Sequence, residues 1–394
     1  MKLSLCIPTN GIVEWISKVI ESIYSQDVPL DQFEVVIIDN GDNALFFDYI
    51  SSVLNEHKNI KYKKTKCPIF MSEIEAYLMA EGDLIKFVNH RTILLDGTLK
   101  KWISFMELNY ERKPIVYFSN GVLDKFFCTY HYDRFEDFIR NLSYWSSWST
   151  GMTIWRDDID GLGDKDDICE LFPHTAILFK NYKNREYLID NSIYLYELPH
   201  SSKHKGRYDL FYAFSVEYPS LLLELYKKGD IGIDTFIMLK QDLFDFIMNL
   251  HRQFITNKEE ASYDLSSFKK NIEVFYSREA VNDWDKRKKE IFSDEWNRRK
   301  KEFEAKNDIK VVFGAGDKGR EQVQKEDKDH VFCFIDNDLN KQGKMLLGIP
   351  VVSLDYYLDS DIDALIIVAT KKENRKNIEK QLICHEVKNY LTVE

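Results

Sequence analysis

Two short apolar runs near the start of the chain each end in polar residues that could bind a ligand. Pro8, Thr9 and Asn10 follow the first run, and Asp39 and Asn40 follow the second. A carboxylate at Asp39 could accept hydrogen bonds from ribose hydroxyls or from the N–H of a base. A structural alternative is that Asp39 caps the segment after it. These residues are therefore candidates for binding a nucleoside.

A glycine pattern in the last quarter of the chain predicts a second ligand site. Gly314, Gly316 and Gly319 match the spacing GxGxxG, and Asp336 comes 22 residues after Gly314. In dinucleotide-binding folds such glycines let the backbone approach a diphosphate, and the acidic residue binds a ribose. Alone the pattern is weak. Apolar strand-like runs before the glycines and directly before Asp336 strengthen it.

The spacing of apolar residues predicts the elements that position the first group. Val13, Ile16, Ile20 and Ile23 recur at helical spacing between the two apolar runs. Strand, helix and strand in this order form a βαβ unit, whose two strands are parallel. Ligands of open α/β sheets bind at the carboxyl ends of the strands. We therefore expect both polar groups to face one crevice.

The two motifs together resemble the opening of family 2 glycosyltransferases of the GT-A type. They read LCIPTN over residues 5–10 and VVIIDNG over residues 35–41. The resemblance is close over residues 1–100 and weaker to about residue 200. It implies a Rossmann-like GT-A fold in which the first loop and Asp39 hold the nucleotide of a sugar donor. The family has a Tyr before the Asn of the first motif, and this chain does not.

A second stretch differs from the family pattern at the positions that hold the metal ion in the family. Residues 82–88 read GDLIKFV, as in the family, but Asn89, His90 and Arg91 stand where the family has Asp-x-Asp. Divalent cations such as Mg²⁺ and Mn²⁺ prefer carboxylate oxygens, so the use of a metal is in doubt. In one interpretation Arg91, alone or with His90, neutralises the donor diphosphate directly, and Asn89 is a further donor-binding candidate. In the other, catalysis is lost and the domain only binds or scaffolds.

The resemblance also suggests where the general base lies. Many family members begin a helix with Glu-Asp at the position that Pro173 and His174 occupy here, and that Asp deprotonates the acceptor. A His can accept a proton near neutral pH, so His174 is the predicted base. Asp167 and Glu170, in the acidic stretch before it, are the alternatives. A purely structural His174 also stays open.

The chain is predicted to be an α/β protein with three parts. Residues 1–208 would form the GT-A domain, residues 209–306 a helical region, and residues 307–394 a small Rossmann-like domain. The last part resembles small domains fused to bacterial sugar-modifying enzymes, which implies either a nucleotide-sugar site or an assembly module. At fewer than ninety residues it is about half of a full dinucleotide-binding fold.

Composition narrows the partners. The 394 residues carry a net charge of −11, which argues against a nucleic-acid partner. The six cysteines show no metal-binding spacing, and Cys6 and Cys333 are expected to be buried in strands. We expect a cytoplasmic protein, since neither a signal peptide nor a membrane span is apparent. Peripheral contact with the inner face of the membrane, through the charged helix predicted near residues 284–306, and a homo-oligomer stay open.

The predicted function is transfer of a sugar from a nucleoside-diphosphate sugar to a hydroxyl of a glycan acceptor. The resemblance implies an inverting course, a lipid-linked acceptor and a role in O-antigen or capsule synthesis. A non-catalytic scaffold that binds nucleotide sugars in the same pathway is the main alternative. An oxidoreductase or epimerase centred on the glycine pattern at residues 314–319 is a further one.

Overall fold

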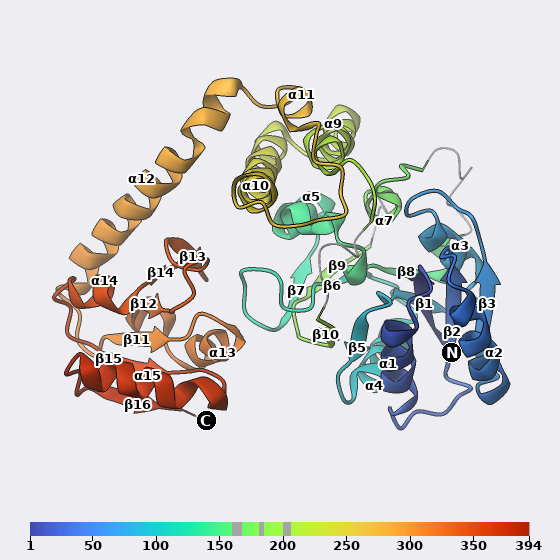
Figure 1. The fold of residues 1–394 in the computed structure, drawn as a ribbon, viewed down its shortest axis with the longest axis horizontal. Coiled ribbons are helices and arrows are strands. Elements are labelled where there is room, and N and C mark those ends of the chain that lie inside the picture. The colour runs from blue at the N-terminus through green and yellow to red at the C-terminus, as the bar shows by residue number, and fades with distance from the viewer. Residues whose placement is uncertain (160–167, 181–184, 200–205, 394) are drawn as a thin grey trace. The chain divides into compact units, whose positions relative to one another are not determined.

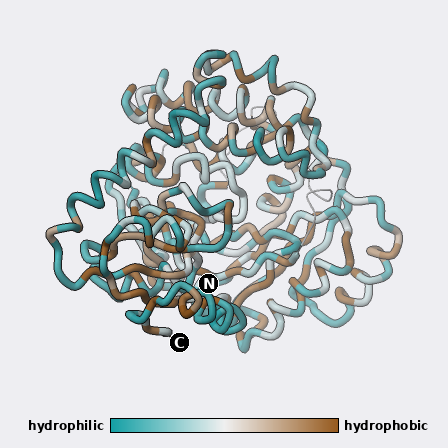
Figure 2. Tube along the Cα trace, turned by 60° about the vertical axis from the view of Figure 1, so that its left-hand side comes forward, coloured by the Kyte–Doolittle hydropathy of each residue, from teal (hydrophilic) through white to brown (hydrophobic). Residues whose placement is uncertain are grey.

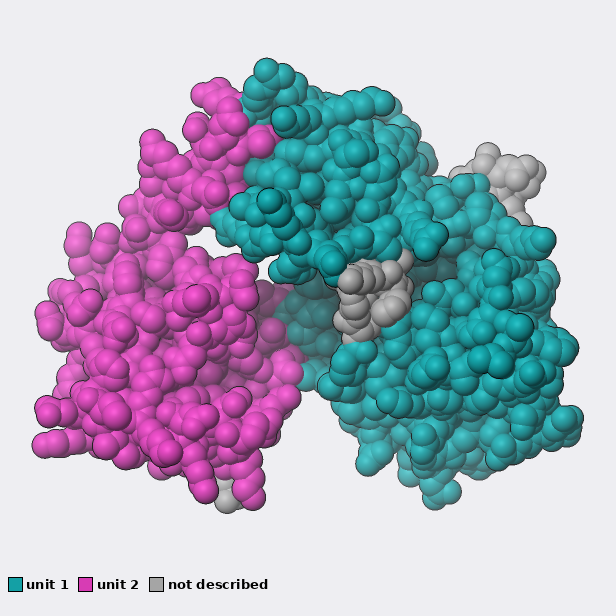
Figure 3. Space-filling view, in the orientation of Figure 1, with its two compact units in different colours: residues 1–123, 128–278 teal, residues 124–127, 279–394 magenta. Residues whose placement is uncertain are grey.

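The structure is a computed structural model that describes residues 1–159, 168–180, 185–199 and 206–393. It divides into two compact units, each considered by itself below (Figure 3). Unit 1 comprises residues 1–123 and 128–278, and unit 2 comprises residues 124–127 and 279–394. The division into three domains at residues 208/209 and 306/307 stays a prediction.

Unit 1 is built on a sheet in the strand order β3-β2-β1-β4-β8 (Figure 1). These strands are β1 (Leu3–Thr9), β2 (Phe33–Asp39), β3 (Ile60–Lys64), β4 (Leu84–Phe87) and β8 (Thr153–Trp155). The first four run parallel, and β8 is antiparallel to β4. Thr9 of β1 pairs with Asp39 of β2, so the predicted βαβ unit is confirmed and both strands end at the same edge.

Helices cover both faces of this sheet, and the alternation along β1 decides which side chain faces which helix. Leu3, Leu5 and Ile7 pack in one core cluster with residues of three helices. These helices are α1 (Val13–Tyr24), α2 (Ala44–Glu56) and α4 (Thr98–Asn109). On the other face the Cys6 thiol lies 3.4 Å from the Ala76 carbonyl of α3 (Ser72–Met79). Cys6 is fully buried, as predicted.

Smaller elements complete the sheet region of unit 1. β5 (Thr92–Leu94) pairs with β10 (Leu195–Glu197), while β6 (Ile115–Phe118), β9 (Tyr187–Asp190) and β7 (Thr129–Tyr132) form another sheet. The helical segments are α5 (Phe135–Leu142), η1 (Ser143–Ser147), η2 (Ser149–Gly151), α6 (Arg156–Ile159) and α7 (Pro173–Leu178). The β5–β10 pair brings the residues before β5 next to those around residue 197.

The helices that follow belong to the same compact unit. They are α8 (Leu210–Tyr212), η5 (Ala213–Glu217), α9 (Tyr218–Lys228), α10 (Ile233–His251), η6 (Arg252–Thr256) and α11 (Phe268–Ile272). Aromatic contacts join them to the earlier part of the chain. The ring of Phe246 on α10 stacks on Tyr144 of η1 with centroids 4.6 Å apart, and meets Phe214 at 5.1 Å.

Unit 2 holds a sheet in the order β13-β14-β12-β11-β15-β16. Its strands are β11 (Lys310–Phe313), β12 (Val331–Ile335), β13 (Lys344–Leu346), β14 (Ile349–Val352), β15 (Leu365–Val368) and β16 (Tyr390–Thr392). Its helical segments are α12 (Arg278–Phe303), α13 (Asp317–Lys325), η7 (Lys328–His330), α14 (Leu354–Leu358) and α15 (Lys372–Cys384). β11, β12 and β15 are parallel, and Cys333 of β12 is buried, as predicted.

The predicted α/β class is confirmed, because each unit packs helices around a largely parallel sheet. Hydrophobic residues gather along the strands, and hydrophilic residues prevail on the outer turns of the helices (Figure 2). No helix in the described ranges is both long enough and apolar enough to cross a membrane.

Candidate active site

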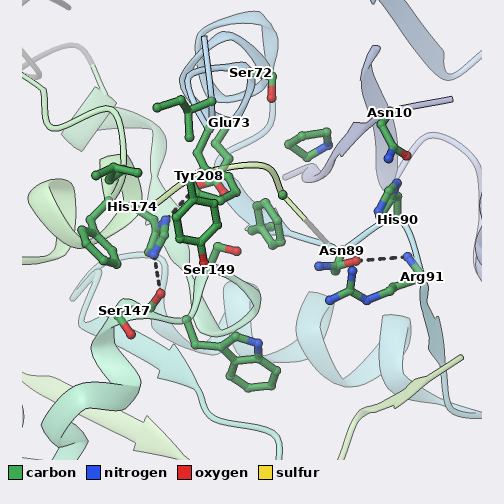
Figure 4. A pocket seen from close by; sticks show the side chains of 18 of the residues that line it. Asn10, Ser72, Glu73, Asn89, His90, Arg91, Ser147, Ser149, His174 and Tyr208 are labelled. Atoms are coloured by element: carbon green, nitrogen blue, oxygen red, sulfur yellow. Dashed lines mark hydrogen bonds and ion pairs between the residues drawn. The ribbon is translucent and has the colours of Figure 1, made fainter. Parts of the chain in front are cut away.

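A cavity of about 440 Å³ opens in unit 1 where β1 and β4 end (Figure 4). The end of β1 contributes Pro8 and Thr9 to its wall, and Asn10 and Asn40 follow β1 and β2. The loop after β4 contributes the residues 89–91. The crevice expected at the carboxyl ends of the strands is therefore present, and these predicted residues line it.

Asp39 lies behind this wall and holds the turn that follows β2 in place. The residue is 2% exposed and is not among those that line the cavity. Its Oδ1 accepts the Gly41 N–H at 2.8 Å, and its Oδ2 accepts bonds from Tyr62 and Lys64 at 3.1 and 2.9 Å. Burial, and then the charge of Asp39, raise the pKa of Tyr62 to about 12. The visible role of Asp39 is structural, and its contact with a nucleoside stays a prediction.

The loop 89–91 presents a cationic side chain to the cavity. Nδ1 of His90 lies 3.0 Å from Oγ1 of Thr9, which ties this loop to the one after β1. Arg91 donates from its backbone N–H to Oδ1 of Asn89 at 3.2 Å, and from Nε to Glu197 at 2.9 Å. Within the described residues, the Nη groups of Arg91 make no hydrogen bond. That side of the guanidinium is suited to a phosphate oxygen pair.

The side chains at this loop do not fit a divalent cation. An amide, an imidazole bonded to Thr9 and a guanidinium replace the carboxylates that Mg²⁺ or Mn²⁺ would need. Among the residues that the structure describes, no group of three or more His, Cys, Asp or Glu side chains is arranged to hold a metal ion. No step of the chemistry proposed below is assigned to a metal.

Aromatic side chains make up much of the remaining wall. They come from segments far apart in the chain, namely Phe70, Tyr144, Trp145, Trp148, Phe172, Tyr208, Phe214, Phe246 and Tyr263. The ring of Tyr208 meets Phe70 at 5.5 Å and Tyr263 at 5.1 Å. Such faces suit the C–H faces of sugar rings. No motif in the sequence pointed to Phe214, Phe246 or Tyr263 as residues of this wall.

His174 lines the cavity, but both of its ring nitrogens lie within hydrogen-bonding distance of other protein groups. The residue is 4% exposed at the start of α7, where Pro173 opens the helix as predicted. Its Nε2 lies 2.8 Å from the Ser147 carbonyl, and its Nδ1 lies 3.0 Å from Oε2 of Glu73 (Figure 4). The geometry does not favour direct contact between His174 and a substrate hydroxyl, so its role as the base stays a prediction.

Glu73 was missed by the sequence reasoning. It lies in the first turn of α3, is 4% exposed and lines the cavity. The sequence feature that could have identified Glu73 is its place beside Ile74 and Tyr77, which are apolar enough to be buried on the same helix. Of the two alternatives to His174, Glu170 is exposed and does not line the cavity, and Asp167 lies outside the described residues.

Unit 2 has a cavity of its own, of about 430 Å³. Gly314, Gly316 and Asp336 line it together with lysines, namely Lys318, Lys341 and Lys371. Gly319 lies beneath, where a Cβ atom would come 1.7 Å from the Gly314 carbonyl oxygen, so this close packing requires glycine. Asp336 accepts bonds from the Ala315 N–H at 2.7 Å and from Lys341 at 3.0 Å. Its visible role is to hold the glycine loop.

The sequence matches no protein-family model and no curated protein. The structure is similar to the crystal structure of residues 1–349 of S. aureus TarS, with 17% identity and a TM-score of 0.46 over 74% of this chain and 80% of that one. A structure of the same fragment in complex with UDP-GlcNAc gives 16% identity and a TM-score of 0.48 over 74% and 81%.

The mannosyltransferase PcManGT from Pyrobaculum calidifontis, in complex with GDP-Man and Mn²⁺, gives 16% identity and a TM-score of 0.41 over 62% of this chain and 69% of that one. Likenesses of this size carry no conclusion about activity. The function has to be inferred from the side chains of the site.

Proposed function

We propose that the protein is a glycosyltransferase that moves a sugar from a nucleoside-diphosphate sugar to a hydroxyl of a glycan. The observation that carries the proposal is the cavity at the carboxyl ends of β1 and β4. It combines a guanidinium at one side, an aromatic wall and a buried carboxylate–imidazole pair at the other (Figure 4). These are the groups that a diphosphate, a sugar ring and an acceptor hydroxyl each require.

The donor would lie across the strand ends. Residues 8–10, with Asn40 beside them, would hold the nucleoside, and Asp39 would keep the turn of Asn40 and Gly41 in shape. Arg91, with Asn89 and His90 next to it, would offset the charge that develops on the leaving diphosphate. The motif resemblance, rather than the cavity, favours an inverting course and a lipid-linked acceptor in O-antigen or capsule synthesis.

Calorimetric titration with UDP, GDP, dTDP and CMP tests the donor site. We expect one nucleotide to bind in the presence of EDTA, and Arg91→Ala to weaken this binding about tenfold or more, since it removes a charge-assisted contact. Arg112→Ala, at a side chain that is 67% exposed and does not line the cavity, is the matched control. Binding that requires Mn²⁺, or that Arg91→Ala leaves unchanged, would contradict the proposed site.

A non-catalytic scaffold that binds nucleotide sugars is the second candidate. The ion pair of Arg91 with Glu197 and the absence of carboxylates at residues 89–91 favour it. The two candidates differ in turnover. UDP-GlcNAc and GDP-mannose, the sugar nucleotides bound in two of the similar structures, are suitable probes. Binding without release of nucleotide diphosphate, with any acceptor, would favour the scaffold.

For the cavity of unit 2 we propose a ligand that carries phosphate, such as a nucleotide sugar. Three lysines and the glycine loop before α13 line it, and such loops bind diphosphates through backbone N–H groups. Asn374 and Asn377 offer hydrogen-bonding groups on the facing helix α15.

A further inference from the structure

We infer that Glu73 is the group that takes the proton from the acceptor hydroxyl, and that His174 is the positioning residue that bonds to Glu73 and orients it. This inference rests on the proposed transferase function and names the base of that reaction. Glu73 and His174 lie 101 residues apart in the chain and meet in the wall of the cavity.

The first argument is location. Both side chains are only 4–5% exposed, and both line the cavity, so what they can reach besides protein is the cavity itself. In Figure 4 the pair lies on one side of the cavity and Arg91 on the other, with Tyr208 and Ser149 between them. A base opposite the group that holds the diphosphate is the arrangement that a direct displacement needs.

The second argument is the placement of protons on His174. The Ser147 carbonyl oxygen can only accept, so Nε2 must carry a hydrogen. The contact of Nδ1 with Glu73 then requires one more proton, which lies on Nδ1 as imidazolium or on the carboxyl group. In the imidazolium form, His174 makes two donated hydrogen bonds and Glu73 is a carboxylate. In this form His174 has no nitrogen left to accept a proton, whereas Glu73 has an oxygen, so Glu73 rather than His174 can act as the base.

The third argument concerns that oxygen. The bond to His174 uses Oε2, and within the described residues the side chain makes no hydrogen bond through Oε1. Two other titratable groups lie on α3, namely Glu75 and Tyr77. Glu75 does not line the cavity and is paired with Lys63 at 2.9 Å. Burial, and then the charge of Glu73, raise the pKa of Tyr77 well above its usual range. Tyr77 therefore stays neutral at ordinary pH and does not compete as a base.

The step balances without a further reactant. The acceptor O–H gives its proton to Oε1 of Glu73, and the freed electron pair of the oxygen forms a bond to the anomeric carbon. The bond from that carbon to the diphosphate oxygen breaks, and its electron pair leaves with the diphosphate, near Arg91. The products are the glycoside, the nucleoside diphosphate and a protonated Glu73, whose proton then passes to water.

Glu73→Gln is the main test, because it keeps the shape of the side chain and removes its basicity. We expect the release of nucleotide from UDP-GlcNAc or GDP-mannose, with a simple glycoside or water as acceptor, to fall about 10²- to 10⁴-fold. Nucleotide affinity should change less than about threefold, because Arg91 holds the donor. Glu75→Gln, on the same helix but outside the cavity wall, is the matched control and should keep wild-type activity.

The role of His174 is tested separately through the pH profile. His174→Gln can still donate to Glu73 but carries no charge, so the acidic limb of the rate profile should move upward in pH. A merely structural role would lower the rate at every pH alike. This second variant also decides the question if Glu73→Gln fails to fold.

The outcomes separate the inference from the function on which it rests. Wild-type turnover together with an active Glu73→Gln, or with an unmoved profile in His174→Gln, overturns the inference and leaves the transferase standing. Absence of wild-type turnover with every sugar nucleotide overturns both.

Discussion

At the scale of single residues, several buried polar side chains make contacts that could not be predicted from the neighbouring residues in the sequence. Lys86 is an example in β4, directly before the loop of the candidate active site. It is 1% exposed, and its ammonium group donates to the carbonyls of Phe87, Thr150 and Met152. The amine also lies 5.3 Å from the ring centre of Trp102. Since no carboxylate among the residues that the structure describes is paired with Lys86, its charge costs stability.

Lys86→Met should change how stability depends on pH. Burial lowers the pKa of Lys86 from its usual 10.5 to about 7. Above pH 7 the folded protein therefore gives up a proton that the unfolded chain keeps until about pH 10.5, so this group makes stability rise with pH between these values. This group should make the free energy of unfolding of the wild type rise by about 1.4 kcal/mol per pH unit. We expect Lys86→Met to lack this contribution when urea unfolding is measured at pH 7, 8 and 9. Lys100→Met, at an exposed position, is the control and should show the same dependence of stability on pH as the wild type.

At the scale of elements, Glu34 of β2 joins the strands that carry the active-site loops. Its carboxylate accepts bonds from Ser4 of β1 at 2.6 Å, from the Glu81 N–H at 2.6 Å and from Lys61 of β3 at 3.0 Å. Gly82 makes room for this network, since a Cβ atom there would come 2.5 Å from Oγ of Ser4. The carboxylate thus fixes the start of β4, and with it the strand that leads to residues 89–91.

Glu34→Gln should destabilise the protein at neutral pH and less so in acid. Burial alone would raise the pKa of Glu34, but the bonds from Ser4, Glu81 and Lys61 outweigh it and lower the pKa from 4.5 to about 2. This stabilisation, about 3 kcal/mol, is complete above pH 4.5 and is lost as the pH falls through 2. In urea unfolding, the difference from wild type should shrink by more than half between pH 7 and pH 3. Glu107→Gln, at an exposed position of α4, should show no such change.

At the scale of the whole molecule, each compact unit has its own cavity at the ends of parallel strands. In unit 1 the wall includes Phe214, Phe246 and Tyr263, so the helical region completes the site that the first sheet begins. In unit 2 the sheet places Gly314, Gly316 and lysines around the second cavity. Each unit therefore has its own set of cavity-lining polar groups, for which we propose phosphate-bearing ligands.

Two separable binding events are expected from the full-length chain. Calorimetry with UDP-GlcNAc should show that Arg91→Ala weakens one event and that Lys341→Ala weakens the other about tenfold, because each variant removes one phosphate-facing charge. Lys325→Ala, at an exposed residue at the end of α13 that does not line the second cavity, is the control. A single event that Arg91→Ala abolishes would show that the second cavity does not bind this ligand.

Much of the frame was determined by the sequence alone, because it depends on neighbours along the chain. The apolar runs that became β1 and β2, and the helical spacing of Ile16, Ile20 and Ile23 between them, required a parallel pair ending at Thr9 and Asp39. Local sequence patterns likewise predicted the polar segments that line the first cavity and the glycine loop that lines the second.

The chemistry within that frame was decided by the tertiary structure, because it depends on residues that only packing brings together. Arg91 meets Glu197 across 106 residues, and His174 meets Glu73 across 101. Asp39 ends β2 and Asp336 directly follows β12, as predicted, yet their oxygens accept bonds from backbone N–H groups and from lysines. A hydrogen bond satisfies a buried polar group whatever the distance along the chain, so spacing alone cannot show which candidates turn toward the protein and which toward a ligand.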